Sequence, residues 1–154
     1  MAFANGLKHE LLDSQTHVWN HLFNYINSMT LKCAIQLGIP DAIHKHDNPM
    51  TLFQLADALS INSAKSDALH RLMWILVHSK FFDKVKISKE DTYCLTGASR
   101  LLLRHEPLSM ASFALVMLDS VSMDPWHRMS EWFRDERSSP FETEHGFMFW
   151  ECWN

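Results

Sequence analysis

The segment from residue 50 to residue 103 changes its hydrophobic period twice, and this change constrains the fold more than any other feature. Leucines at three- and four-residue spacings predict a helix over residues 52–59 and a second helix with its apolar residues between 69 and 77. Alternating residues near Val85 and the segment 93–96 then predict two strands joined by a polar hairpin turn. Two helices followed by a hairpin are typical of a winged helix. We therefore expect a mainly α domain with a small β-hairpin wing.

Further helices are predicted on the N-terminal side of this segment. Residues 11–28 place most of their large apolar side chains three or four positions apart, which predicts an amphipathic helix. A second helix follows up to Leu37, and Gly38 suits its left-handed C-cap. Pro40 then begins a short helix, since a proline is tolerated in the first turn but would disrupt the helix that precedes it.

Three hydroxyl residues are predicted to cap helices. Thr51 precedes the helix over residues 52–59, Ser63 precedes the next helix, and Ser99 precedes a short helix near residues 101–103. A side-chain oxygen at the N-cap accepts a hydrogen bond from an N–H group of the first turn that has no partner within the helix. These caps would fix where each helix of the winged helix begins.

The chain after residue 107 is expected to form a different layer. Residues 110–118 are strongly apolar, and Pro125 opens a helix that contains further aromatic and methionine side chains. Residues 134–140 form a polar loop, and an aromatic segment without a closing signal follows. We therefore divide the chain into a winged-helix domain over residues 1–107 and a set of helices over residues 108–154.

The charge balance argues against broad binding to nucleic acids or anionic membranes. The formal net charge is −4 at pH 7, whereas such binding depends on a cationic surface. In the second helix of the winged helix, Lys65 and Arg71 are offset by Asp67, so we expect no sequence-specific reading of DNA. There is no apolar run long enough for a membrane span and no apolar leader at the start of the sequence. We expect a cytoplasmic protein with no nucleic-acid or membrane partner.

The cysteine and histidine spacings do not predict a disulfide framework or a metal site. Cys33, Cys94 and Cys152 are odd in number and far apart, so we expect reduced thiols. His17 and His21 are four residues apart on one predicted helix, a spacing that can bind zinc, but no third ligand is evident. We therefore predict no metal.

Several groups of residues suggest a family, because they occur in a fixed order along nearly the whole chain. They are Met29-x-Leu31-Lys32-x-Ala34-x-x-Leu37-x-Ile39-Pro40-Asp41, Thr51-Leu52-x-x-Leu55-Ala56, Arg71-Leu72-Met73-x-x-Leu76-x-x-x-x-Phe81-Phe82, Tyr93-x-Leu95-Thr96-x-x-Ser99-x-Leu101-Leu102, Leu118-Asp119, Met123-Asp124-Pro125-Trp126-His127-x-Met129 and Phe141-x-x-x-His145-Gly146-x-x-x-Trp150-Glu151. In these groups the chain resembles plant S-adenosylmethionine-dependent O-methyltransferases, the type that methylates phenolic hydroxyls of flavonoids, phenylpropanoids and alkaloids.

This resemblance implies a homodimer and a small phenolic acceptor. The N-terminal part of such enzymes is a mainly helical dimerisation domain in which two subunits intertwine, and residues 25–29 would lie near the partner's pocket. Five residues match positions that line the acceptor pocket or border the methyl donor. They are Phe113, Met117, Phe149, Trp150 and Trp153. Six Trp, ten Phe and nine Met in 154 residues agree with this implication, since planar phenols bind best between flat or soft apolar walls.

The resemblance also implies what these residues lack. The family's chemistry belongs to a Rossmann-like domain that contains a G-x-G-x-G loop for S-adenosylmethionine and a histidine base, and the sequence shows neither. Its four glycines are all more than three residues apart, which excludes a G-x-G loop. We predict that these residues are the N-terminal dimerisation and partial acceptor-binding region of such an enzyme, with no catalytic or cofactor-binding residue of their own. The alternative is a stand-alone dimerisation module without activity that pairs with itself or with full-length relatives.

Overall fold

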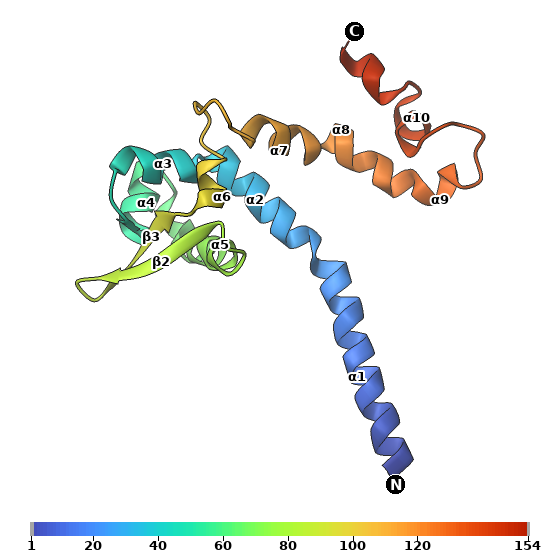
Figure 1. Ribbon diagram of the computed structural model, residues 1–154, viewed down its shortest axis with the longest axis horizontal. Helices are drawn as coiled ribbons and strands as arrows, with labels where there is room; N and C mark the ends of the chain where they lie inside the picture. Colours follow the sequence, from blue (N-terminus) through green and yellow to red (C-terminus); the bar gives the residue numbers. More distant parts are fainter. Residues whose placement is uncertain (1, 154) are drawn as a thin grey trace.

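The computed structural model describes the backbone of residues 2–153 and the side chains of residues 9–151, and it is mainly helical (Figure 1). The helices are α1 (Ala2–Phe23), α2 (Tyr25–Leu37), α3 (Ile39–His46), α4 (Leu52–Ala58), α5 (Ser66–His78), α6 (Gly97–Arg100), α7 (Ala111–Met117), α8 (Ser120–Met123), α9 (Met129–Trp132) and α10 (Pro140–His145). The strands are β1 (Met50–Thr51), β2 (Phe82–Ile87) and β3 (Glu90–Leu95), and the 3₁₀ helices are η1 (Ser63–Lys65), η2 (Asp124–Arg128) and η3 (Phe149–Trp153).

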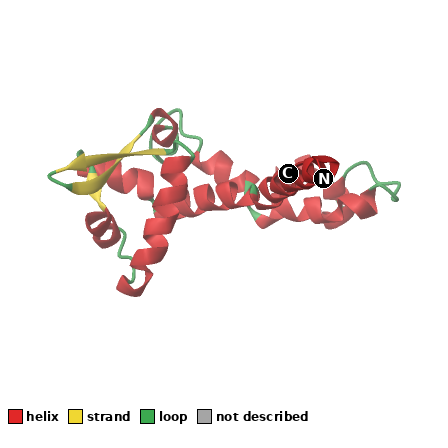
Figure 2. Ribbon diagram, turned by 90° about the horizontal axis from the view of Figure 1, so that it is seen from below, coloured by secondary structure: helices red, strands yellow, loops and turns green. Residues whose placement is uncertain are grey.

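Three parts of the molecule can be followed in Figure 1. A body made of α3 to α6 and the sheet lies at one end, α1 projects away from this body, and α7 to α10 extend from it in a second direction. Figure 2 shows the strands gathered at one end, with the later helices reaching toward the other. None of the described helices combines the length and hydropathy of a membrane-spanning segment.

The body is the predicted winged helix. Its core is formed by side chains with almost no exposed surface, which come from α2 to α5 and from the sheet. The central members are Ala34, Ile39, Leu55, Met73 and Phe82. The core therefore draws on the same apolar positions that gave the helical spacing in the sequence, which confirms the predicted mainly α fold with a β wing.

The wing contains one strand more than the predicted hairpin. Strands β2 and β3 pair antiparallel, with Phe82 opposite Leu95. Strand β1 adds to the other edge of β3, so that the sheet has the order β1-β3-β2. This strand has only two residues, Met50 and Thr51, and two residues are too few to show an alternating pattern in the sequence. Its pairing with β3 fixes the start of α4 against the sheet.

Two of the predicted caps are confirmed. Gly38 adopts a left-handed conformation with φ of 78°, which glycine reaches at little cost, and its N–H bonds back to α2. The Thr51 hydroxyl accepts a hydrogen bond from the N–H of Gln54, and the N–H of Thr51 donates to the side-chain oxygen of Gln54. These two bonds make a complete capping box. The starts of α3 and α4 are therefore determined by local sequence.

The other two predicted caps are wrong by one to three positions. Asn62, not Ser63, caps the turn before α5, since its side-chain oxygen accepts from the N–H of Ala64 at 2.9 Å. Thr96, not Ser99, caps α6, and the Ser99 hydroxyl instead accepts from the N–H of Thr96 at 2.9 Å. In both segments polar residues cluster, and an oxygen can reach the first turn from more than one position.

The predicted helix over residues 11–28 is divided in the structure. Helix α1 ends at Phe23 and α2 begins at Tyr25, so the last predicted residues belong to the next helix. Of these two helices, α2 is the one that packs against the core of the body. Its neighbour α1 leaves the large apolar side chains of residues 9–23 at least half exposed, including Trp19 at 56% and Leu22 at 63%.

The helices after residue 107 are attached to the body through α2. Ile35 packs against Leu102 and Ala111 in a second, smaller cluster. Lys32 adds a polar tie, since its Nζ donates to the backbone oxygen of Leu118 at 2.7 Å and lies 3.7 Å from a carboxylate oxygen of Asp119. The ammonium thus stands at the carbonyl end of α7, where a positive charge is favourable.

We expect Phe82→Ala to lower the free energy of unfolding by about 3–5 kcal/mol, because it removes a fully buried ring and leaves a cavity in the core. The matched control is Phe53→Ala on α4, whose ring is 82% exposed, with an expected change within about 0.5 kcal/mol. Urea unfolding followed by circular dichroism measures both. Equal losses in the two variants would contradict the described core.

Candidate functional site

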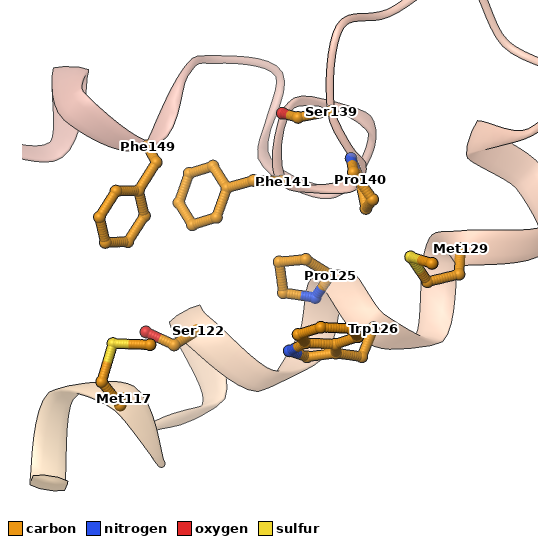
Figure 3. A pocket seen from close by; sticks show the side chains of 9 residues that line it. All are labelled: Met117, Ser122, Pro125, Trp126, Met129, Ser139, Pro140, Phe141 and Phe149. Carbon is orange, nitrogen blue, oxygen red and sulfur yellow. The ribbon is translucent and has the colours of Figure 1, made fainter.

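An apolar cleft of about 360 Å³ lies between η2 on one side and α10 with η3 on the other (Figure 3). Its lining consists of apolar and aromatic side chains together with two hydroxyl groups. They are Met117, Ser122, Pro125, Trp126, Met129, Ser139, Pro140, Phe141 and Phe149. A cleft of this size and composition suits a small, flat, mostly apolar ligand.

The two walls of the cleft differ in origin. Phe141 and Phe149 form one wall, with ring centroids 5.2 Å apart and planes at 88°, an edge-to-face contact. Phe141 is only 8% exposed and also contacts Phe147. Pro125 and Trp126 form the facing wall, from η2. A planar guest between these walls would contact ring faces or edges on both sides.

Polar contacts hold α10 over η2 and α8. Arg128 donates to the carboxylates of Glu144 and Glu131, and the ring Nε2 of His145 lies 2.9 Å from the backbone oxygen of Val121. Ser139 caps the start of α10 by accepting from the N–H of Glu142. The hydrogen bond from Arg128 lowers the pKa of Glu144, because it stabilises the charged carboxylate. The ionised form of Glu144 thus joins α10 to η2 through Arg128.

The residues predicted for the site are distributed over this layer. Met117 and Phe149 line the cleft. Phe113 and Trp150 are 61% and 65% exposed and are not among the lining residues. The side chain of Trp153 lies outside the part of the chain whose side chains the structure describes. Their role toward an acceptor stays a prediction.

The residues at the centre of the cleft were not predicted from the sequence. Pro125, Trp126 and Phe141 belong to the sequence groups used above, but nothing in their spacing shows that they face one another. They are separated by the polar loop over residues 134–140, and the return of the chain after this loop brings them together. The available signal was a pair of aromatic segments on either side of one polar loop.

A second unusual surface belongs to α1 and the start of α2. Seven of its described apolar side chains are exposed by half or more. They are Leu11, Leu12, Val18, Trp19, Leu22, Phe23 and Tyr25. Trp19 and Phe23 pack edge to face with centroids 5.9 Å apart, on the same helix. A contiguous exposed apolar surface on a projecting helix is typical of an interaction with another protein surface.

The histidine pair on α1 does not form a metal centre with other described residues. The rings of His17 and His21 are 5.8 Å apart, and the described side chains include no group of three or more potential ligands that could hold an ion. Two ligands alone leave the tetrahedral shell of zinc incomplete.

Comparison with known families identifies the winged-helix body. Residues 19–105 match the family model of the O-methyltransferase dimerisation domain. This chain therefore belongs to the O-methyltransferase dimerisation domain family.

Two similar plant proteins come from Mentha piperita and Ocimum basilicum. The chain is 61% identical over 161 aligned residues to 8-hydroxyquercetin 8-O-methyltransferase of Mentha piperita, an alignment that covers 97% of this chain and 44% of that protein. It is 66% identical over 138 residues to flavonoid 8-O-methyltransferase 1 of Ocimum basilicum, covering 88% of this chain and 38% of that protein. The chain thus spans about two fifths of the length of these relatives.

Solved structures share the fold at low sequence identity. Human N-acetylserotonin methyltransferase, solved in complex with S-adenosylmethionine, superposes with a TM-score of 0.72 at 18% identity, covering 88% of this chain and 38% of that one. The pyocyanin biosynthetic protein PhzM superposes with a TM-score of 0.72 at 22% identity, covering 91% of this chain and 39% of that one. The fold is therefore common to enzymes of distant sequence.

We expect the protection of the α10 amides against hydrogen exchange to depend on pH through the ionisation of Glu144. The pKa of this group is lowered in the folded protein, so its contribution is present above the unfolded value of about 4.3 and is lost as the pH falls through the folded value. Hydrogen exchange of the α10 amides should accelerate in acid, after correction for the intrinsic rate. Glu144→Gln should remove this step, and Glu136→Gln in the exposed loop should keep it. A step that persists in Glu144→Gln would contradict the assignment to this ion pair.

Proposed function

We propose that this chain is the N-terminal dimerisation and partial acceptor-binding region of an enzyme that transfers a methyl group from S-adenosylmethionine to a phenolic hydroxyl of a plant secondary metabolite. The alignment with the Mentha piperita protein supports this most directly, because it covers 97% of the chain at 61% identity. In this proposal residues 1–107 form the dimerisation domain, and residues 108–154 contribute helices of the acceptor pocket.

The cleft supports the acceptor-binding part of the proposal. Flat aromatic side chains stand on both walls, and Met117 and Met129 lie toward its two ends (Figure 3). Ring faces and thioethers provide broad dispersion contacts and exclude water from a planar guest. The relatives named above are flavonoid methyltransferases by name, and a flavonoid-like phenol is the acceptor class we infer for this chain.

The exposed face of α1 supports the dimerisation part. We infer a homodimer in which this face packs against a second copy, with residues 25–29 near the partner's pocket. Burying side chains such as Trp19 and Leu22, now more than half exposed, would favour association by about 25 cal/mol for each Å² of apolar surface removed from water. The family match to a dimerisation domain includes Trp19 and Leu22.

The described residues do not fit the methyl donor. S-adenosylmethionine is held in Rossmann-like folds at the carboxyl ends of parallel strands, beside a glycine-rich turn. The sheet of residues 2–153 is antiparallel with three strands, and Gly97 is the glycine nearest to any of them. We therefore derive no step of methyl transfer from these residues, and we place the donor and the base outside them.

The glycine spacing favours one alternative, a dimerisation module without activity that pairs with itself or with full-length relatives. Such a module needs the α1 face but has no use for the cleft. The two proposals therefore differ in one observable, which is the binding of a phenol by the 154-residue chain.

We expect the chain to be a dimer by light scattering at micromolar concentration. The double variant Trp19→Glu and Leu22→Glu should weaken dimerisation by about 30-fold or more, because it would bury charge in an apolar interface. Phe53→Glu, at an even more exposed apolar position on α4, should leave the mass unchanged. A monomeric parent chain would contradict the dimerisation proposal.

We expect the chain to bind 2-naphthol, a planar phenol, in a titration followed by ligand-observed NMR. Phe149→Ala should weaken this binding by about five-fold or more through loss of an aromatic wall. Trp150→Ala changes a neighbouring aromatic residue outside the lining and serves as the matched control. Absence of 2-naphthol binding would favour the dimerisation module. Loss of binding only in Trp150→Ala would show that the phenol binds outside this cleft.

A further inference from the structure

The apolar cleft has one polar end. Of its two hydroxyl residues, Ser139 already caps α10 through its hydrogen bond with the N–H of Glu142. The hydroxyl of Ser122 is half-buried and makes no hydrogen bond with another described residue, although the backbone N–H of Ser122 bonds to Asp119. In Figure 3 this hydroxyl points toward the side chain of Met117, below Phe149.

Trp126 adds a second donor to the same end. Its indole nitrogen lies on the side of the ring that faces Ser122 in Figure 3, and it makes no hydrogen bond with any described group. In contrast, the indole N–H of Trp132 in the same layer donates to the backbone oxygen of Arg137 at 2.9 Å. Trp126, which is 66% exposed and lines the cleft, therefore differs from Trp132 in leaving its N–H without a partner among the described residues.

We propose that Ser122 and the indole N–H of Trp126 orient a planar aromatic guest by donating hydrogen bonds to an oxygen substituent on its ring. This inference rests on the proposed acceptor-binding function and names the guest more closely. The indole nitrogen can only donate, so the matching group is an acceptor oxygen, such as a ring carbonyl, an ether or a phenol oxygen. Among otherwise apolar walls, such a pair selects for guests that satisfy it.

The alternative occupants of the polar end are water and a neighbouring protein surface. Water would satisfy both donors without selecting any guest. A protein surface that covers the cleft would exclude small guests. Both alternatives predict that removing the Ser122 hydroxyl has no effect that depends on an oxygen atom of the guest.

The test compares 2-naphthol with naphthalene, two flat guests that differ by one hydroxyl group. Dissociation constants are measured by ligand-observed NMR for the parent chain, Ser122→Ala, Ser122→Thr and Trp126→Phe. Ser130→Ala on α9 is the matched control, because this serine lies outside the lining of the cleft. Circular dichroism establishes that each variant keeps its helical content.

We expect Ser122→Ala to weaken 2-naphthol by about three- to ten-fold, the usual range for one hydrogen bond, and to leave naphthalene unchanged. Ser122→Thr should retain the preference for 2-naphthol, and Trp126→Phe should reduce it while keeping an aromatic wall. Equal weakening of both guests, or an unchanged ratio, would overturn the orienting role and leave the acceptor-binding proposal standing. Absence of binding by both guests to the parent chain would overturn both proposals.

Discussion

The whole arrangement depends on helix α2 being buried on two sides at once. Ala34 belongs to the core of the winged helix, and its neighbour Ile35 belongs to the smaller cluster with Leu102 and Ala111. Both are essentially inaccessible to solvent. Consecutive helical residues point about 100° apart, so one helix can join two packed layers only if both faces are apolar. Through this helix the body fixes where the cleft-bearing helices begin.

The two layers differ in how they are stabilised. The winged helix has a continuous core of buried aliphatic and aromatic side chains, whose removal would leave cavities. The layer after residue 107 has few fully buried side chains. It depends instead on Phe141, on the ties from Lys32 and His145, and on the exposed ion pairs of Arg128. Exposed ion pairs contribute little, so this layer is the part whose shape responds most readily to a bound guest or partner.

The same difference explains how far the sequence could predict the structure. The helices of the body follow from spacing, and Gly38 and Thr51 were identified as caps because a left-handed residue and a hydroxyl have specific local effects. Strand β1 was missed because two residues have no period. The caps at Asn62 and Thr96 were missed because neighbouring polar residues compete for the same N–H groups. The family resemblance predicted Met117 and Phe149 as lining residues. Only the folded structure showed that Trp126 and Ser122 line the same cleft.

The sequence by itself determined the family, the winged helix and the absence of a glycine-rich donor loop among these residues. Each of these depends on local order along the chain: spacing, caps and glycine positions. The tertiary structure alone decided that Phe141 returns over Pro125, that the hydroxyl of Ser122 and the N–H of Trp126 stand at one end of the cleft, and that α1 keeps an exposed apolar face. Contacts between residues far apart in the chain arise from packing, and the hydrophobic pattern records only that a side chain is apolar, not which partner it meets.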